Sequence, residues 1–161
     1  MKILVAYYSR TGVTKKVAEI IAQRLNAEIE EIRDTVNRSG IKGYLLSGRD
    51  ATKRILTKLE PSKHNPTDFD LVIIGTPIWS WNLSAPARTY ATDHKGSFGK
   101  IAFFCTMGGS GDKRACAEME NIVGKKAVSM MGIPTKDAAK NNFSQDLERF
   151  LADIETETSP E

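Results

Sequence analysis

Short apolar runs alternate with amphipathic segments along the whole chain. Residues 2–8, 70–75 and 100–106 are almost continuously apolar, which is typical of strands that are covered on both faces. Residues 27–33 alternate apolar and acidic side chains, and this period of two predicts a strand at the edge of a sheet. A shorter apolar run at residues 127–131 predicts a fifth strand.

The segments between these strands carry apolar side chains three and four residues apart. In the first of them, Val17, Ile21 and Leu25 recur at helical spacing, which predicts a helix with one apolar face. The helices predicted in this way cover residues 14–25, 49–59, 86–93, 112–123 and 144–154.

This regular alternation predicts an α/β fold in which helices cover both faces of a parallel sheet. Five strands in 161 residues fit a doubly wound five-stranded sheet in the order 2-1-3-4-5. We expect a single domain over residues 1–155, followed by a frayed tail over residues 156–161. Such sheets bind ligands beyond the carboxyl ends of their strands, so the loops after the first, third and fourth strands should meet at one site.

Charge and composition exclude several classes of function. The formal net charge is +3, and the basic residues fall in scattered pairs without interleaved aromatic residues, which argues against nucleic-acid binding. The mild basicity favours an acidic partner or an anionic nucleotide. No apolar run reaches the roughly 18 residues that span a bilayer, and no small-residue cleavage site follows the first apolar run. We therefore expect a cytoplasmic protein without a membrane span.

The cysteines and histidines do not form a metal-binding pattern. Cys105 and Cys116 are the only cysteines, and no CxxC motif or Cys/His cluster joins them. We expect no metal site, while a disulfide between the two cysteines remains open. His64 and His94 stand alone in polar surroundings, and we expect them to be solvated loop or helix-end residues.

The first loop runs directly from the first predicted strand into the first predicted helix. It consists of Ser9, Arg10, Thr11, Gly12, Val13 and Thr14. Unpaired backbone N–H groups and the helix dipole favour an anion at a helix N-terminus. The three hydroxyl groups can donate to phosphate oxygens, and glycine lets the backbone approach closely. The loop is therefore a candidate phosphate site, although a capped helix start is the simpler interpretation.

Other anion-binding motifs are missing from the sequence. Neither GxxxxGK[ST] nor GxGxxG follows the first strand, which excludes a P-loop NTPase and the dinucleotide fingerprint. Neither cysteine has an arginine five residues later, as a low-molecular-weight phosphatase requires. A response-regulator receiver would need acidic residues where Ser9 and Thr76 stand.

The segment VAYYSRTGVTKKVA, residues 5–18, resembles the phosphate-loop signature of the flavodoxin family. Its characteristic positions are occupied by Tyr7, Ser9, Gly12, Thr14 and Ala18. Ala6 is smaller than the bulky apolar residue that the signature usually carries. The resemblance implies a flavodoxin-like fold, non-covalently bound FMN and a function in electron transfer.

The second loop follows the third predicted strand and begins with Thr76, Pro77, Ile78, Trp79 and Ser80. An isoalloxazine ring needs a flat apolar neighbour and backbone groups at its pyrimidine edge. Trp79 stands where flavodoxins often carry the tryptophan that flanks the flavin, and Pro77 would stiffen the loop. Trp81 is the other candidate for that contact. Alternatively, both tryptophans pack the loop against a helix.

The third loop follows the fourth predicted strand and contains Thr106, Met107, Gly108, Gly109, Ser110 and Gly111. Its glycines leave backbone N–H groups free to bond the pyrimidine edge of a flavin, although an ordinary glycine-rich turn would look the same. Flavodoxins commonly carry a tyrosine over the outer flavin face at this loop, and they are strongly acidic. This loop has no aromatic residue, so a hydride donor or a quinone could reach the uncovered flavin face.

The leading hypothesis is an FMN-binding electron carrier that serves partner proteins and has no catalytic residue of its own. The alternative is an NAD(P)H-dependent quinone or flavin oxidoreductase, in which Arg10, Lys113 or Arg114 would contact nucleotide phosphates. A flavin-free binding module with the same fold is a third possibility. Residues 34–47 either form a flap beside the site or lead into the second helix.

Overall fold

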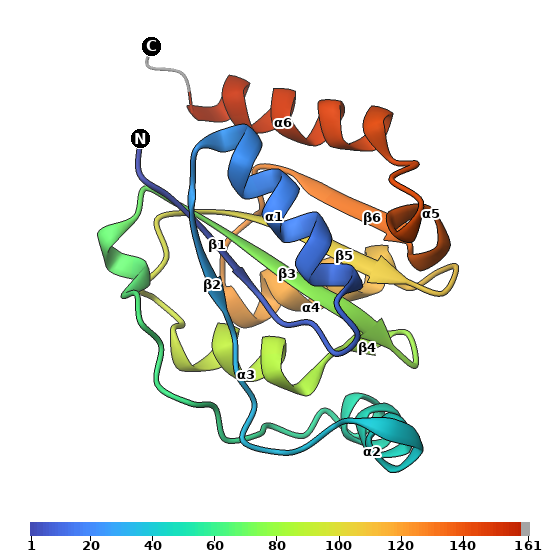
Figure 1. Ribbon diagram of the computed structural model, residues 1–161. Coiled ribbons are helices and arrows are strands. Elements are labelled where there is room, and N and C mark those ends of the chain that lie inside the picture. The colour runs from blue at the N-terminus through green and yellow to red at the C-terminus, as the bar shows by residue number, and fades with distance from the viewer. Residues whose placement is uncertain (159–161) are drawn as a thin grey trace.

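A parallel sheet forms the middle layer of the computed structural model, which describes residues 1–158 (Figure 1). Its strands follow the order β2-β1-β3-β5-β6, which confirms the predicted 2-1-3-4-5 topology. These strands are β1 (Ile3–Tyr7), β2 (Glu28–Glu31), β3 (Leu71–Trp79), β5 (Lys100–Met107) and β6 (Met130–Pro134). A sixth strand, β4 (Asn82–Leu83), pairs antiparallel with the end of β3. The prediction missed β4 because two residues are too few to show a period.

Helices cover both faces of the sheet, as predicted. The helices α1 (Val13–Leu25) and α6 (Ser144–Thr158) pack on one face, and α3 (Ala85–Asp93) and α4 (Asp112–Val123) pack on the other (Figure 1). The helix α2 (Gly40–Thr52) lies at the edge of the molecule and contacts α3, β3 and β4. Two short elements complete the chain, the 3₁₀ helix Pro66–Asp68 and α5 (Thr135–Ala139).

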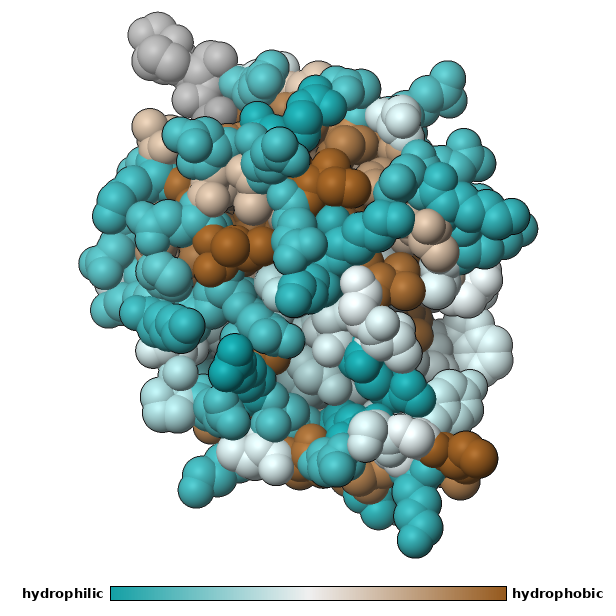
Figure 2. Space-filling model, in the orientation of Figure 1, coloured by the Kyte–Doolittle hydropathy of each residue, from teal (hydrophilic) through white to brown (hydrophobic). Residues whose placement is uncertain are grey.

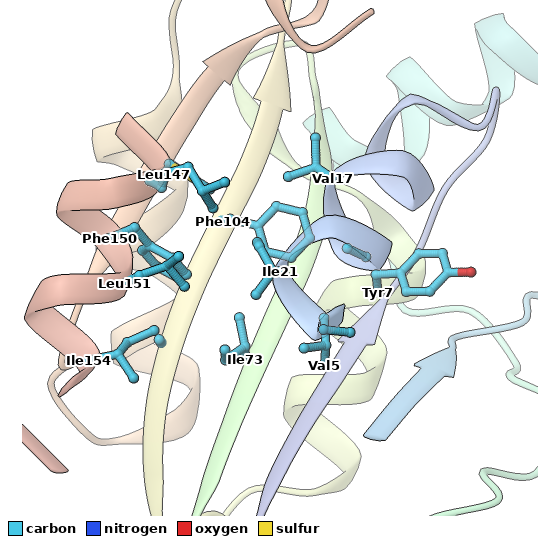
Figure 3. Close-up of a cluster of buried hydrophobic side chains, with 14 of the residues drawn as sticks. Val5, Tyr7, Val17, Ile21, Ile73, Phe104, Leu147, Phe150, Leu151 and Ile154 are labelled. Atoms are coloured by element: carbon cyan, nitrogen blue, oxygen red, sulfur yellow. The ribbon is translucent and has the colours of Figure 1, made fainter. Parts of the chain in front are cut away.

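Side chains of the sheet and of its helices form two apolar cores, one on each face of the sheet. In β1, Val5 and Tyr7 face the α1/α6 core, whereas Leu4 and Ala6 face the opposite one. Figure 3 shows the first core, where Phe150 of α6 and Ile21 of α1 lie over the same face of the sheet. Because both faces of the central strands are covered, their sequences are continuously apolar.

The second helix begins nine residues earlier than predicted and also ends earlier. It covers Gly40–Thr52 rather than residues 49–59. Glycine weakens a helix in general, but a Cβ at Gly43 would lie 2.0 Å from the Arg38 carbonyl carbon, so glycine is required for close packing there. Beyond the helix, Arg54 takes a left-handed conformation with φ 53° and the chain turns away.

The other differences concern the ends of elements. The last strand covers Met130–Pro134, three residues beyond the predicted 127–131. The last helix continues to Thr158, so the tail predicted to fray from residue 156 is helical over its first three residues. Residues 159–161 of that tail lie outside the described residues.

Gly75 in β3 gives a direct test of core packing. A Cβ at this position would lie 2.1 Å from Cζ of the buried Phe104 ring. We expect Gly75→Ala to lower the free energy of unfolding by about 2 kcal/mol or more, since overpacking forces neighbouring side chains out of place. Urea unfolding measures this. The matched control is Gly108→Ala, where a Cβ would meet nothing within 4 Å, and equal unfolding midpoints for the two variants would contradict the prediction.

Candidate functional site

The ends of β1, β3 and β5 lie side by side, so the three loops that follow them meet at one edge of the sheet (Figure 1). A groove of about 200 Å³ opens there. Residues of the first loop, the end of β3, the end of β5, α2 and α5 line it: Arg10, Thr11, Val13, Thr14, Pro77, Ile78, Trp79, Thr106, Tyr44 and Thr135. Residues from all three predicted segments therefore lie around one groove.

The first loop presents an open helix N-terminus to this groove. Gly12 precedes α1 with a φ of 93°, a conformation that favours glycine, and no side chain caps the helix. The first turn of α1 carries no acidic residue. Ser9 Oγ accepts a hydrogen bond from the Gly12 N–H at 3.0 Å and so holds the turn. The loop therefore has the shape and the free N–H donors that a phosphate group requires.

A buried pair of threonine hydroxyls joins the first loop to the end of β5. Thr14 Oγ1 and Thr106 Oγ1 lie 2.8 Å apart, and both side chains line the groove. One hydroxyl donates to the other, which leaves the second hydrogen available to another acceptor. The pair fixes the position of α1 against the sheet at the floor of the groove.

Trp79 is a half-buried residue that ends β3 and lines the groove. The Tyr8 ring lies perpendicular to the Trp79 ring, at a centroid distance of 5.5 Å and an interplanar angle of 90°. The Arg38 guanidinium lies 5.5 Å from its ring centroid. Trp79 is thus held from two sides by groups that leave part of its indole facing the groove.

Trp81 occupies a different position. Its side chain is 62 % exposed, and its indole N–H donates to Ser110 Oγ at 3.0 Å. Ser80 and Trp81 form the turn between β3 and β4, and both are in the left-handed region with φ values of 47° and 61°. This conformation costs a non-glycine residue about 1 kcal/mol or more. Trp81 ties the second loop to the third and does not line the groove.

The third loop packs closely on the second. A Cβ at Gly111, where φ is 110°, would lie 3.0 Å from Ile78 Cγ2 and 3.1 Å from Trp81 Cα. Glycine at this position therefore permits the close approach of the two loops. Gly108 and Gly109 are exposed and face open space, so their backbone groups are accessible to a ligand.

Several predicted site residues lie around the groove without lining it. Thr76 is buried and shares a hydrogen bond with Ser84 Oγ at 2.8 Å. Met107 is also buried, and its carbonyl accepts a hydrogen bond from Thr135 Oγ1. The remaining residues of this group are Ser9, Gly12, Ser80, Gly108, Gly109, Ser110 and Gly111.

Two lining residues were not predicted. Tyr44 of α2 is 65 % exposed, and the Arg10 guanidinium lies 5.5 Å from its ring centroid. Arg10 Nε is buried and has no hydrogen-bond partner among residues 1–158. Thr135 begins α5. Tyr44 is an aromatic residue in a glycine-rich segment, and this pattern could have indicated a flap beside the site. Nothing in the sequence indicated that Thr135 lines the groove.

A buried ionic network lies behind Trp79. The Arg38 side chain is 2 % exposed and contacts Asp34 Oδ2 at 2.6 Å and Asp50 Oδ2 at 2.9 Å. Burial disfavours the charged guanidinium, but hydrogen bonds to the two aspartates outweigh it and raise the pKa of Arg38. Burial also raises the pKa of Tyr8 to about 12, so this phenol stays neutral beside Trp79.

None of the cysteines and histidines described lines the groove. Within residues 1–158, no three His, Cys, Asp or Glu side chains gather as metal ligands would. Cys105 and Cys116 are buried free thiols. His64 contacts Glu28 at 2.9 Å, whereas His94 packs against the Tyr90 ring and burial lowers its pKa. His94 is the C-cap of α3, which is the helix-end position expected for it, but its ring packs against Tyr90 and is half-buried rather than solvated. None of the described helices is long and apolar enough to cross a membrane.

The fold is α/β, and the groove lies where the winding of the sheet reverses, which is the position at which such sheets bind ligands. The flavodoxin family model matches residues 2–146, and the chain belongs to this family. No curated protein matches the chain.

Solved structures share this fold. A Lactobacillus acidophilus flavoprotein in complex with FMN is 23 % identical, with a TM-score of 0.71, over 89 % of this chain and 98 % of its own. The apo-form of the flavoprotein from the same organism is 24 % identical, with a TM-score of 0.62, over 82 % and 91 %. General stress protein 14 of Treponema denticola, in complex with FMN, is 13 % identical, with a TM-score of 0.54, over 94 % and 97 %.

Proposed function

We propose that the chain binds FMN non-covalently in the groove at the ends of β1, β3 and β5 and moves electrons through it. The observation that carries this proposal is the meeting of an uncapped helix N-terminus and a half-buried tryptophan in one groove. A phosphorylated ring system needs both features. The two structures named above as complexes with FMN have the same fold.

The phosphate group would be held by the first loop, residues 9–14. Backbone N–H groups of Thr11, Val13 and Thr14 and the dipole of α1 favour an anion there. The unpartnered Arg10 Nε adds a cationic donor that this site can use. No acidic side chain in the first turn of α1 opposes the anion.

The ring would lie against the second and third loops. Trp79 and Tyr44 offer flat surfaces, and Pro77 and Ile78 offer apolar contacts. The exposed backbone from Gly108 to Ser110 offers N–H donors for the pyrimidine edge. FMN supplies the redox chemistry, while these residues bind it, orient it and exclude water from one face.

The function that we favour is that of a flavodoxin-type carrier between redox partner proteins. No described group beside the groove has the arrangement of a nucleophile with its base, and the flavin alone suffices for electron transfer. The second candidate is an NAD(P)H-dependent quinone or flavin oxidoreductase. It is favoured by a further groove of about 390 Å³ that shares Trp79 with the first, because a small substrate could bind there.

Two measurements on purified protein test this proposal. We expect the absorption bands of oxidised flavin and, after denaturation, release of FMN. A carrier should oxidise NADH or NADPH with a quinone acceptor at less than about 1 s⁻¹, below the usual range of enzymes. Turnover well above this rate would favour the oxidoreductase. A colourless protein that takes up no added FMN would refute both candidates.

A further inference from the structure

A second groove lies between α2 and the turn that joins β3 to β4, with a volume of about 390 Å³. It shares Tyr44, Ile78 and Trp79 with the first groove. The two grooves are therefore neighbours that have Trp79 in their common wall. A volume of a few hundred Å³ is enough for a small aromatic molecule.

The walls of the second groove are apolar. Tyr44 and Leu45 project from α2 and are each 65 % exposed, while Ile78 and Trp79 face them from β3. Figure 2 shows hydrophobic side chains at the lower edge of the molecule, where Figure 1 places α2. Exposed apolar side chains that gather beside a groove are typical of a binding surface. Two opposed apolar walls favour a flat ligand.

Positive charge lies at one end of this groove. Arg49 and Lys53 both line it and stand one helical turn apart. Asp50, the one carboxylate of α2, is buried and already binds Arg38 at 2.9 Å and Arg49 at 2.7 Å. Lys53 forms no ion pair with any residue in the described part of the chain. The groove therefore offers an uncompensated cation next to apolar walls.

We propose that the second groove binds a planar aromatic molecule that carries an anionic group. The ring lies between the Tyr44/Leu45 wall and the Ile78/Trp79 wall, and the anion meets Lys53, with Arg49 beside it. This places a small electron donor or acceptor next to the proposed flavin. That role rests on the proposed function, whereas binding itself does not require a flavin.

The probe is anthraquinone-2-sulfonate, and 2-(hydroxymethyl)anthraquinone is its neutral counterpart. Isothermal titration calorimetry with the full chain and saturating FMN measures the dissociation constants. Lys53→Gln should weaken sulfonate binding by about threefold to fivefold, as expected for an exposed charge pair, and leave the neutral compound unchanged. The matched control is Lys42→Gln, which removes a charge of the same helix that does not line the groove.

A second pair of variants tests the apolar wall. Leu45→Ala should weaken binding of both compounds by about fivefold, because part of a buried apolar contact is lost. Ile41→Ala is the control, since Ile41 is 82 % exposed on α2 and does not line the groove. The dissociation constant of FMN, measured separately, should be unchanged in all four variants.

The inference is overturned if the FMN-loaded chain fails to bind the sulfonate, or if Lys42→Gln weakens binding as much as Lys53→Gln. A probe that FMN displaces would also overturn it, because the second groove would then belong to the flavin site. If the chain takes up no FMN, the proposed function fails and the same titration is carried out on the chain alone. The two proposals can thus fail independently.

Discussion

Replacing Trp79 by leucine is expected to weaken FMN binding by about 30-fold. Stacking of a planar ring on an aromatic side chain contributes about 1–3 kcal/mol, and 2 kcal/mol corresponds to about 30-fold in a dissociation constant. Trp79 lines the groove and is held there by Tyr8 and Arg38. Leucine keeps an apolar side chain but offers no flat surface.

Trp81→Leu is the matched control for this variant. Trp81 is 62 % exposed and bonds Ser110 rather than lining the groove, so we expect its loss to change FMN affinity by less than about threefold. Quenching of FMN fluorescence measures both dissociation constants, and urea unfolding of the apoproteins checks that each variant is folded. A larger loss of affinity in Trp81→Leu would mean that Trp81 contacts the flavin.

Replacing Arg38 by methionine is expected to lower the free energy of unfolding by about 3–5 kcal/mol. The substitution leaves the carboxylates of Asp34 and Asp50 buried without their shared cation, and removing one partner of a buried ion pair typically costs this much. The loss is a large part of the 5–15 kcal/mol that stabilises a typical domain. Urea unfolding measures it.

Two further variants separate charge burial from lost packing. Adding Asp34→Asn and Asp50→Asn to Arg38→Met removes the buried carboxylate charges that lost Arg38, and it should recover part of the stability. Asp50 otherwise keeps only its ion pair with the exposed Arg49. Arg149→Met removes an exposed ion pair with Asp146 and should leave the unfolding midpoint unchanged. If Arg38→Met is as stable as Arg149→Met, the ionic network does not support α2 and Trp79.

The central strands and the long helices that cover them could be predicted closely from the sequence. The start of β5 at Lys100 and the ends of α1 at Leu25 and α4 at Val123 match the predicted positions, because long apolar runs and clear helical periods mark them. The extent of α2 could not be predicted, since Gly43 is needed for a contact with Arg38 that is visible only in three dimensions. The short elements β4 and α5 carry too few residues for any period.

The lining residues of the groove could be predicted where they stand at the ends of strands, but not where they come from other elements. Residues 9–14 and Trp79 stand directly after or at the end of apolar strands, which topology brings together. Tyr44 and Thr135 reach the groove from α2 and α5, whose positions depend on tertiary packing. The burial of Arg38 had no sequence signal, because one arginine in a polar segment is usually exposed.

The comparison of FMN with riboflavin tests most directly whether the first loop and Trp79 hold a phosphorylated ring. Riboflavin has the same ring without the phosphate, and hydrogen bonds to a charged group contribute about 1.5–3 kcal/mol each. Fluorescence titration of the apoprotein should give a dissociation constant for FMN near or below about 1 µM, and one for riboflavin at least about 100-fold higher. Equal affinity for the two flavins, or binding of neither, would contradict this account.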